Sequence, residues 1–192
     1  MPAVLVVTGP SGAGKGTLIR ELVERVPGIE VTVSATTRER RRGEEDGREY
    51  GFLSDDDFLA RVARGEFLEH VEFVSGHRYG TLRSELARIR ADGHVPLLEL
   101  ETEGALDVKA KEPNAVTIFI SAAVEELERR LRDRATESTG EIGERIALAR
   151  EQLKQAEAFD YVVENDNLER ALDELSELAR GLLAPAGTMS RP

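Results

Sequence analysis

The sequence predicts an α/β fold in which a mostly parallel, five-stranded sheet is covered by helices on both faces. Three observations carry this prediction: five short apolar segments resemble buried strands, helical patterns separate most of them, and the first strand runs into a glycine-rich turn. Apolar strands that alternate with helices are typical of parallel sheets between two helical layers. Ligands of such folds bind at the carboxyl ends of the strands.

The predicted strands are short segments rich in apolar residues, as expected for buried strands. They cover residues 3–7, 29–33, 95–100, 116–120 and 161–163. Ser54 before three aspartates predicts the start of a helix, and Gly65 predicts its end. Another helix is expected over residues 82–92, and residues 134–143 are expected to be irregular.

The chain is expected to form one core with two inserted parts. The core takes residues 1–33, 95–126 and 156–192, the last of these with a C-terminal helix and a frayed tail. Residues 34–94 form a small subdomain that is rich in charge and glycine, and residues 127–155 form a helical lid.

Composition excludes several function classes. The chain has 26 basic and 37 acidic residues, a net charge of −11, which disfavours polynucleotides and anionic membranes as partners. It has no cysteine, so disulfides and thiolate metal sites are excluded and a reducing compartment is favoured. The apolar runs are too short for a membrane span or a signal sequence. We therefore expect a cytoplasmic protein.

A phosphate-binding pattern follows the first strand. Its glycines allow successive backbone N–H groups to converge on anionic oxygens, and the next helix points its positive end at the same anion. The residue after the lysine is usually a Ser or Thr that ligates magnesium, but here it is Gly16. A glycine-rich turn without a ligand is the alternative. The segment expected to hold ATP comprises Gly9, Pro10, Ser11, Gly12, Ala13, Gly14, Lys15, Gly16 and Thr17.

An arginine cluster follows in residues 34–50, with five arginines within eleven positions of an otherwise acidic chain. Guanidinium groups bind phosphate oxygens in two-point fashion, and a tyrosine hydroxyl adds a donor. A solvated charged loop, balanced by its own glutamates, explains the composition equally well.

Several motifs together resemble those of guanylate kinases over nearly the whole chain. The family pattern Ser-x-Thr-Thr-Arg-x-x-Arg-x-Gly-Glu, with Gly-x-x-Tyr after it, matches residues 34–50, and Phe-Leu-Glu and Tyr-Gly-Thr match residues 67–69 and 79–81. The resemblance implies a P-loop fold and a binding site for GMP. Its phosphate would bind Arg38, Arg41, Tyr50 and Tyr79, and its guanine would be recognised by Ser34, Glu69 and Thr81.

Two further motifs depart from the family pattern. The family's Asp-x-Asp-x-Gln-Gly-Ala appears with Glu99, Glu101 and Glu103 at the acidic and amide positions. The resemblance implies that Glu99 lies on the guanine side and that Glu101 contacts magnesium through water, although glutamates at a strand end are also common on surfaces. In the lid motif, the family's glycine is Ala135.

The lid resemblance implies that Arg134 and Arg145 close on the ATP phosphates, with surface salt bridges as the alternative role. Asn165 would lie beside the adenine, or would simply form an Asx turn. Lys15, Arg38, Arg134 and Arg145 are then the catalytic candidates.

The activity implied is transfer of the γ-phosphoryl group from ATP to GMP or dGMP, with Mg²⁺ as the cofactor of ATP. A kinase of another nucleoside monophosphate or of a sugar phosphate is one alternative. A non-catalytic, protein-binding module of the same family is another. A monomer and a homodimer both fit the sequence.

Overall fold

The computed structural model describes residues 2–73, 76–133 and 139–184 of the 192-residue chain. The chain divides into two compact units, one formed by Met1–Ile29 with Leu97–Pro192 and the other by Glu30–Pro96. It leaves the first unit within β2 (Ile29–Val31) and returns within β7 (Val95–Glu99). Among the described residues, no helix is long and apolar enough to cross a membrane.

A five-stranded sheet has the strand order β2-β7-β1-β8-β9. The central strand β1 (Val4–Thr8) pairs in parallel with β7 and with β8 (Ala115–Ser121), and β8 pairs in parallel with the edge strand β9 (Tyr161–Glu164). Every residue of β1 is buried. The predicted α/β fold is confirmed, and all five predicted strands are present with ends shifted by one or two residues.

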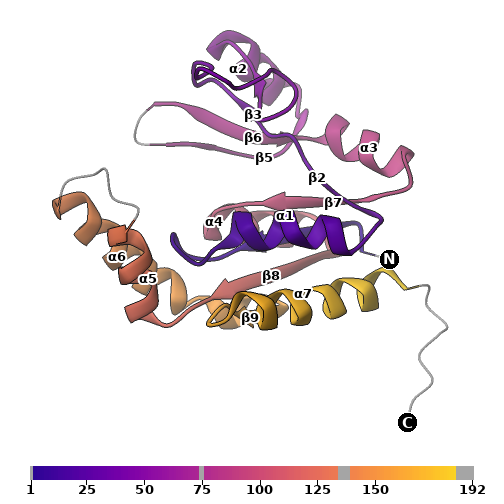
Figure 1. The fold of residues 1–192 in the computed structure, drawn as a ribbon. Helices are drawn as coiled ribbons and strands as arrows, with labels where there is room; N and C mark the ends of the chain where they lie inside the picture. The colour runs from indigo at the N-terminus through magenta and orange to yellow at the C-terminus, as the bar shows by residue number, and fades with distance from the viewer. Residues whose placement is uncertain (1, 74–75, 134–138, 185–192) are drawn as a thin grey trace. The chain divides into compact units, whose positions relative to one another are not determined.

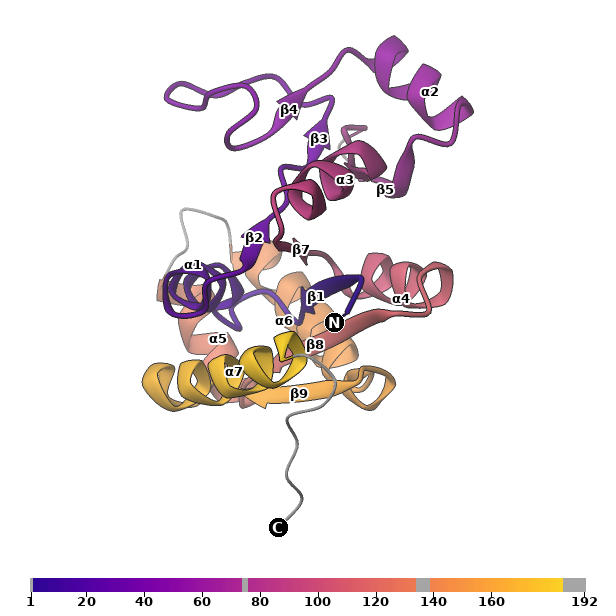
Figure 2. The same cartoon turned by 90° about the vertical axis from the view of Figure 1, so that its right-hand side faces the viewer.

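Helices cover both faces of the sheet in the first unit. Helices α1 (Lys15–Arg25) and α7 (Leu168–Leu183) pack against each other on one side of the strands, and α4 (Thr102–Lys111) lies on the other side (Figure 2). Helices α5 (Val124–Asp133) and α6 (Thr139–Leu153) also pack together (Figure 1). A short 3₁₀ turn, η1 (Ala156–Ala158), leads to β9.

The prediction of an irregular stretch over residues 134–143 is partly wrong. Residues 134–138 and the expected frayed tail after Ala184 lie outside the described residues, but α6 already begins at Thr139 and contains Gly140 and Gly143. Gly140 lies in the first turn, but Gly143 lies further inside the helix, where a glycine costs about 1 kcal/mol relative to alanine. The buried Ala149 and Gln152 further along α6 anchor the helix to the protein and offset this cost.

The second unit contains a four-stranded sheet of order β4-β3-β6-β5. Its strands are β3 (Ala35–Thr36), β4 (Gly51–Phe52), β5 (Phe67–Glu72) and β6 (Arg78–Leu82), and its helices are α2 (Asp55–Ala63) and α3 (Arg83–Ala91).

A small aromatic core holds this unit together. Phe58 of α2 stacks on Phe67 of β5 with ring centroids 4.4 Å apart, and both pack against Ala35. The predicted start of α2 is confirmed, because the Ser54 hydroxyl accepts a hydrogen bond from the Asp57 N–H at 3.1 Å. The helix expected over residues 82–92 is confirmed as α3.

Candidate functional site

The glycine-rich loop joins β1 to α1 and needs glycine at particular positions. Gly9 and Gly14 have φ angles of +139° and +86°, in a region that favours glycine. A Cβ atom on Gly9 would lie 2.2 Å from the Ile120 carbonyl oxygen, and one on Gly14 would lie 2.6 Å from Asn165 Nδ2. The backbone of the loop therefore runs against the end of β8 and against the turn after β9.

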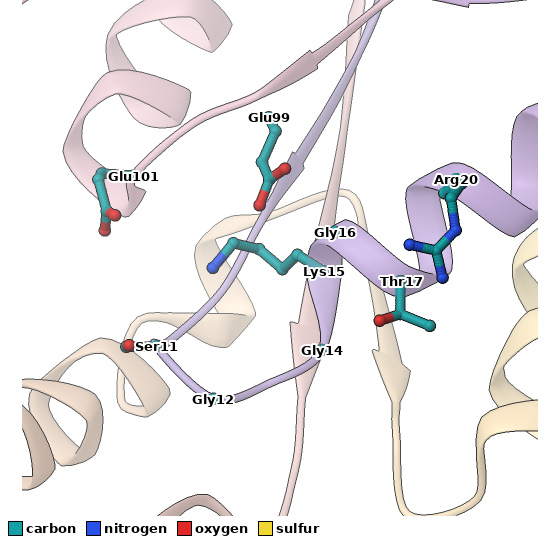
Figure 3. A pocket seen from close by; sticks show the side chains of 9 residues that line it. All are labelled: Ser11, Gly12, Gly14, Lys15, Gly16, Thr17, Arg20, Glu99 and Glu101. Atoms are coloured by element: carbon teal, nitrogen blue, oxygen red, sulfur yellow. The ribbon is translucent and has the colours of Figure 1, made fainter. Parts of the chain in front are cut away.

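Lys15 is the first residue of α1, and its side chain folds over the loop. Its Nζ donates to the carbonyl oxygens of Gly9 at 2.7 Å and Pro10 at 3.2 Å. Burial lowers the pKa of Lys15, while Glu101 and Glu99 act in the opposite direction. Figure 3 shows the ammonium group on the side of the loop where both carboxylates lie.

A pocket of about 430 Å³ opens over the loop (Figure 3). Its lining combines backbone N–H groups, one lysine, one arginine and two carboxylates, and all of these residues belong to the first unit. The lining residues are Ser11, Gly12, Gly14, Lys15, Gly16, Thr17, Arg20, Glu99 and Glu101. This composition suits an anion that arrives with a cation.

The two glutamates stand just before α4. Glu99 is exposed at the pocket, yet the surrounding protein withdraws enough water from its carboxylate to raise its pKa, an effect that the nearby Lys15 opposes. Glu101 accepts a hydrogen bond from Nε2 of the buried Gln152 at 3.3 Å. Sequence reasoning missed Gln152, because nothing in its helical pattern indicates which carboxylate it reaches.

Of the lid residues, Arg134 lies outside the described residues. Arg145 extends from α6 to the loop, where its Nη2 donates to Ser11 Oγ at 2.8 Å. The structure thus brings one of the two predicted lid arginines to the glycine-rich loop.

Asn165 does not line the pocket. It is buried in the turn after β9, and its Nδ2 donates to the Ala13 carbonyl oxygen at 2.7 Å. Arg130 of α5, to which the sequence assigned no role, contacts the same part of the loop.

A second candidate cluster lies in the other unit and surrounds Arg38. Its guanidinium makes a two-point ion pair with Glu44, with distances of 2.9 and 3.0 Å, and lies 5.3 Å from the ring centroid of Tyr50. The hydrogen bonds to Glu44 and, secondarily, to Tyr79 raise the pKa of Arg38. The rings of Tyr50 and Tyr79 are 5.9 Å apart. Three of the four predicted phosphate ligands therefore lie together.

The fourth ligand, Arg41, is exposed, and its backbone N–H donates to Glu44 at 2.8 Å. Ser34 is partly buried just before β3, and its carbonyl oxygen accepts from Gly51 N–H at 2.9 Å. These two contacts shape the turn that carries the arginines.

Glu69 and Thr81 face each other across the β5–β6 pair. Both are buried, with exposed fractions of 4% and 0%. The Thr81 hydroxyl finds no hydrogen-bond partner within the described part of the chain. A buried hydroxyl without a partner costs free energy unless a ligand supplies one.

Gly80 allows this approach. A Cβ on Gly80 would lie 2.7 Å from the Glu69 carbonyl oxygen and 2.8 Å from Phe67. The Tyr-Gly-Thr motif therefore needs its glycine for packing between β5 and β6.

Comparison with known proteins places both clusters in context. A family model described as guanylate kinase matches residues 1–181. The guanylate kinase of Rubrobacter xylanophilus is 44% identical over 94% of this chain and 95% of its own length. That of Prochlorococcus marinus is 48% identical over 90% of this chain and 92% of its own length.

A solved guanylate kinase structure also resembles this chain. The crystal structure of guanylate kinase from Anaplasma phagocytophilum matches with a TM-score of 0.73 and 30% identity, covering 95% of this chain and 87% of that one.

Proposed function

Because the chain belongs to the guanylate kinase family, we propose that it transfers the γ-phosphoryl group of ATP to GMP reversibly, giving ADP and GDP. The observation that supports the acceptor most directly is the buried Glu69 opposite the buried hydroxyl of Thr81, which has no partner among the described residues. Guanine presents two N–H donors on one edge, which one carboxylate accepts together, and an O6 acceptor for a hydroxyl. Adenine lacks this pair of N–H donors, because its N1 is an acceptor.

The donor site is the glycine loop. Its N–H groups and Lys15 bind the ATP phosphates in the pocket over the loop. On ATP binding, Lys15 would give up its hydrogen bonds to the Gly9 and Pro10 carbonyl oxygens and bind phosphate oxygens instead. Arg145 would give up its hydrogen bond to Ser11 and bind the phosphoryl group that is transferred. Arg134 is proposed as a second lid contact.

Mg²⁺ is proposed as the cofactor of ATP, where it neutralises phosphate charge during transfer. Gly16 has no side chain to ligate it, and no cluster of three or more metal-ligating side chains occurs among residues 2–73, 76–133 and 139–184. The donor set fits an ion that arrives on the nucleotide: Glu101, held by Gln152, is placed to accept hydrogen bonds from its water shell.

The acceptor phosphate would bind the Arg38 cluster. Arg38 is already oriented by Glu44 and lies against Tyr50, so little side-chain freedom is lost on binding. We assign Arg41, Tyr50 and Tyr79 to the same phosphate, Ser34 to the guanine and Glu99 to the guanine side of the site. Residues 34–94 are then the GMP-binding subdomain and residues 127–155 the lid.

The chemistry needs no general base, because the attacking atom is an anionic phosphate oxygen. The protein therefore holds two phosphates in line, neutralises their repulsion through Lys15, Arg38 and Arg145, and excludes water. We place the protein in the cytoplasm, consistent with the absence of cysteine, and propose a monomer or homodimer.

Initial rates with ATP and a panel of GMP, dGMP, AMP, UMP and CMP test the proposal. GMP and dGMP should be preferred, and Glu69→Gln should reduce kcat/KM for GMP by about a hundredfold, since a buried carboxylate would no longer meet two donors. Glu72→Gln, an exposed change on the same strand, is the matched control. Preference for another acceptor would refute the guanine assignment, and binding of a phosphopeptide without turnover would indicate a protein-binding module.

A further inference from the structure

Two residues far from the loop in sequence hold its carbonyl groups. Asn165 Nδ2 donates to Ala13 O at 2.7 Å, and Arg130 Nη1 donates to Gly12 O at 3.3 Å and lies 3.5 Å from Ala13 O. The sequence separations are 117 to 152 residues. Neither Arg130 nor Asn165 is among the residues that line the pocket.

Peptide geometry gives these contacts a consequence for binding. Described peptide bonds are all trans, so the N–H of each peptide points opposite to its C=O. A donor on Ala13 O therefore turns the Gly14 N–H away from Asn165, toward the pocket that Gly14 lines. The preceding peptide is fixed at both ends, because Ala13 N–H donates to Pro10 O at 3.2 Å while Gly12 O accepts from Arg130.

The two residues are themselves held in place. Arg130 Nε donates to Glu126 at 2.6 Å, and Arg130 Nη2 donates to the Asn165 carbonyl oxygen at 3.1 Å. The Asn165 N–H donates to Ser121 O at 2.8 Å, at the end of β8. The loop is thus tied through a continuous network to α5 and to the central sheet.

We propose that Arg130 and Asn165 are positioning residues that hold the carbonyl groups of Gly12 and Ala13 and so orient the Gly14 N–H of the glycine loop toward the bound anion. The inference rests on the proposed function only in taking the loop as the triphosphate site. Asn165 would then contribute to ATP binding through the loop rather than by direct contact. Helix α5 would contribute in the same way through Arg130.

Binding of inorganic tripolyphosphate, measured by calorimetry beside ATP binding, tests the proposal. Arg130→Met and Asn165→Ala should each lower the affinity for tripolyphosphate and for ATP by the same factor. We expect a factor of about ten, which corresponds to one lost hydrogen bond in an ordered network. Tripolyphosphate has no base, so weakened binding of ATP alone would show a direct contact with the nucleoside and would overturn the proposal.

Control variants separate positioning from charge and from folding. Arg129→Met removes a neighbouring arginine that also pairs with Glu126, and it should leave tripolyphosphate binding unchanged. Asn167→Ala removes the N-terminal cap of α7, so it should lower the melting temperature without weakening tripolyphosphate binding. Arg130→Lys keeps the charge but cannot serve both carbonyl partners, so it should still weaken binding several-fold. Wild-type affinity in Arg130→Lys would reduce the role of Arg130 to charge and overturn the proposal.

A double-variant cycle adds a test that a fold defect cannot imitate. Because both residues act on the same peptides, Arg130→Lys combined with Asn165→Ala should lose little more affinity than the worse single variant. If the affinity losses of the two single variants simply added in the double variant, the two residues would act independently, and the proposal would be overturned. Tripolyphosphate binding is measured without GMP, so these results stay distinct from a failure of the proposed acceptor.

Discussion

Gly14 offers a sharp test of how the loop is built. Replacing it by alanine places a Cβ atom 2.6 Å from Asn165 Nδ2 while keeping a backbone φ of +86°. The left-handed conformation costs an alanine about 1–2 kcal/mol. Displacing Asn165 also breaks its bond to Ala13, worth about 1 kcal/mol. The expected loss of unfolding free energy is therefore about 2–3 kcal/mol.

Thermal unfolding measures this loss. For a chain of this length, the melting temperature should fall by about 5–10 °C. Gly16→Ala, two residues away, is the matched control: a Cβ at this helical position would meet nothing within 4 Å, so the change should be neutral or stabilising by up to about 1 kcal/mol. Equal stability of Gly14→Ala and the wild type would refute the packing argument.

Three shorter predictions concern the carboxylates and the missing loop hydroxyl. Partial desolvation by the surrounding protein raises the pKa of Glu99 above its ordinary 4.5, so the folded state binds this proton more tightly than the unfolded state. The folded state therefore loses stability as the pH rises from 4.5 through the raised pKa. Glu99→Gln should therefore raise the melting temperature at pH 8 but not at pH 4, and a rise at both values would contradict this reasoning. Glu99→Asp and Glu101→Asp should change kcat while leaving the melting temperature within about 2 °C, because neither carboxylate supports the core; a larger fall would mark a structural role. Gly16→Ser should lower the Mg²⁺ concentration needed for half-maximal rate, measured by metal titration at saturating ATP, and an unchanged requirement would show that this position does not face the ion.

Local sequence signals were enough for the elements but not for the contacts between them. The β1 run and the glycine loop carry their own signals, because buried strands and tight turns restrict residue choice locally. The same holds for the start of α2 at Ser54. The start of α6 at Thr139 was missed because two glycines near it favour a loop locally, whereas packing later in the helix decides the outcome.

The positioning contacts of the site had no local signal at all. Gln152 reaches Glu101 across 51 residues, and Arg130 reaches Gly12 across 118. A glutamine or arginine on an amphipathic helix has the same pattern whether it faces solvent or a loop. Conversely, the Glu69–Thr81 pair could be identified from the family motifs, but its burial and its opposed register depend on the pairing of β5 with β6.

If the pocket over the glycine loop binds ATP as proposed, its charges would favour a metal-bound nucleotide even though no hydroxyl follows the lysine. Glu101 and Glu99 act on Lys15 against the lowering of its pKa by burial, so both carboxylates are close enough to offset part of its charge. A bare triphosphate would add several negative charges beside two carboxylates, which repel it in a partly buried site. A divalent cation carried on the nucleotide offsets that repulsion, and Glu101, fixed by Gln152, can bind its water shell without ligating it. Under the proposed function, selectivity for the metal-bound nucleotide would therefore come from repulsion of the free nucleotide rather than from a protein ligand to the metal.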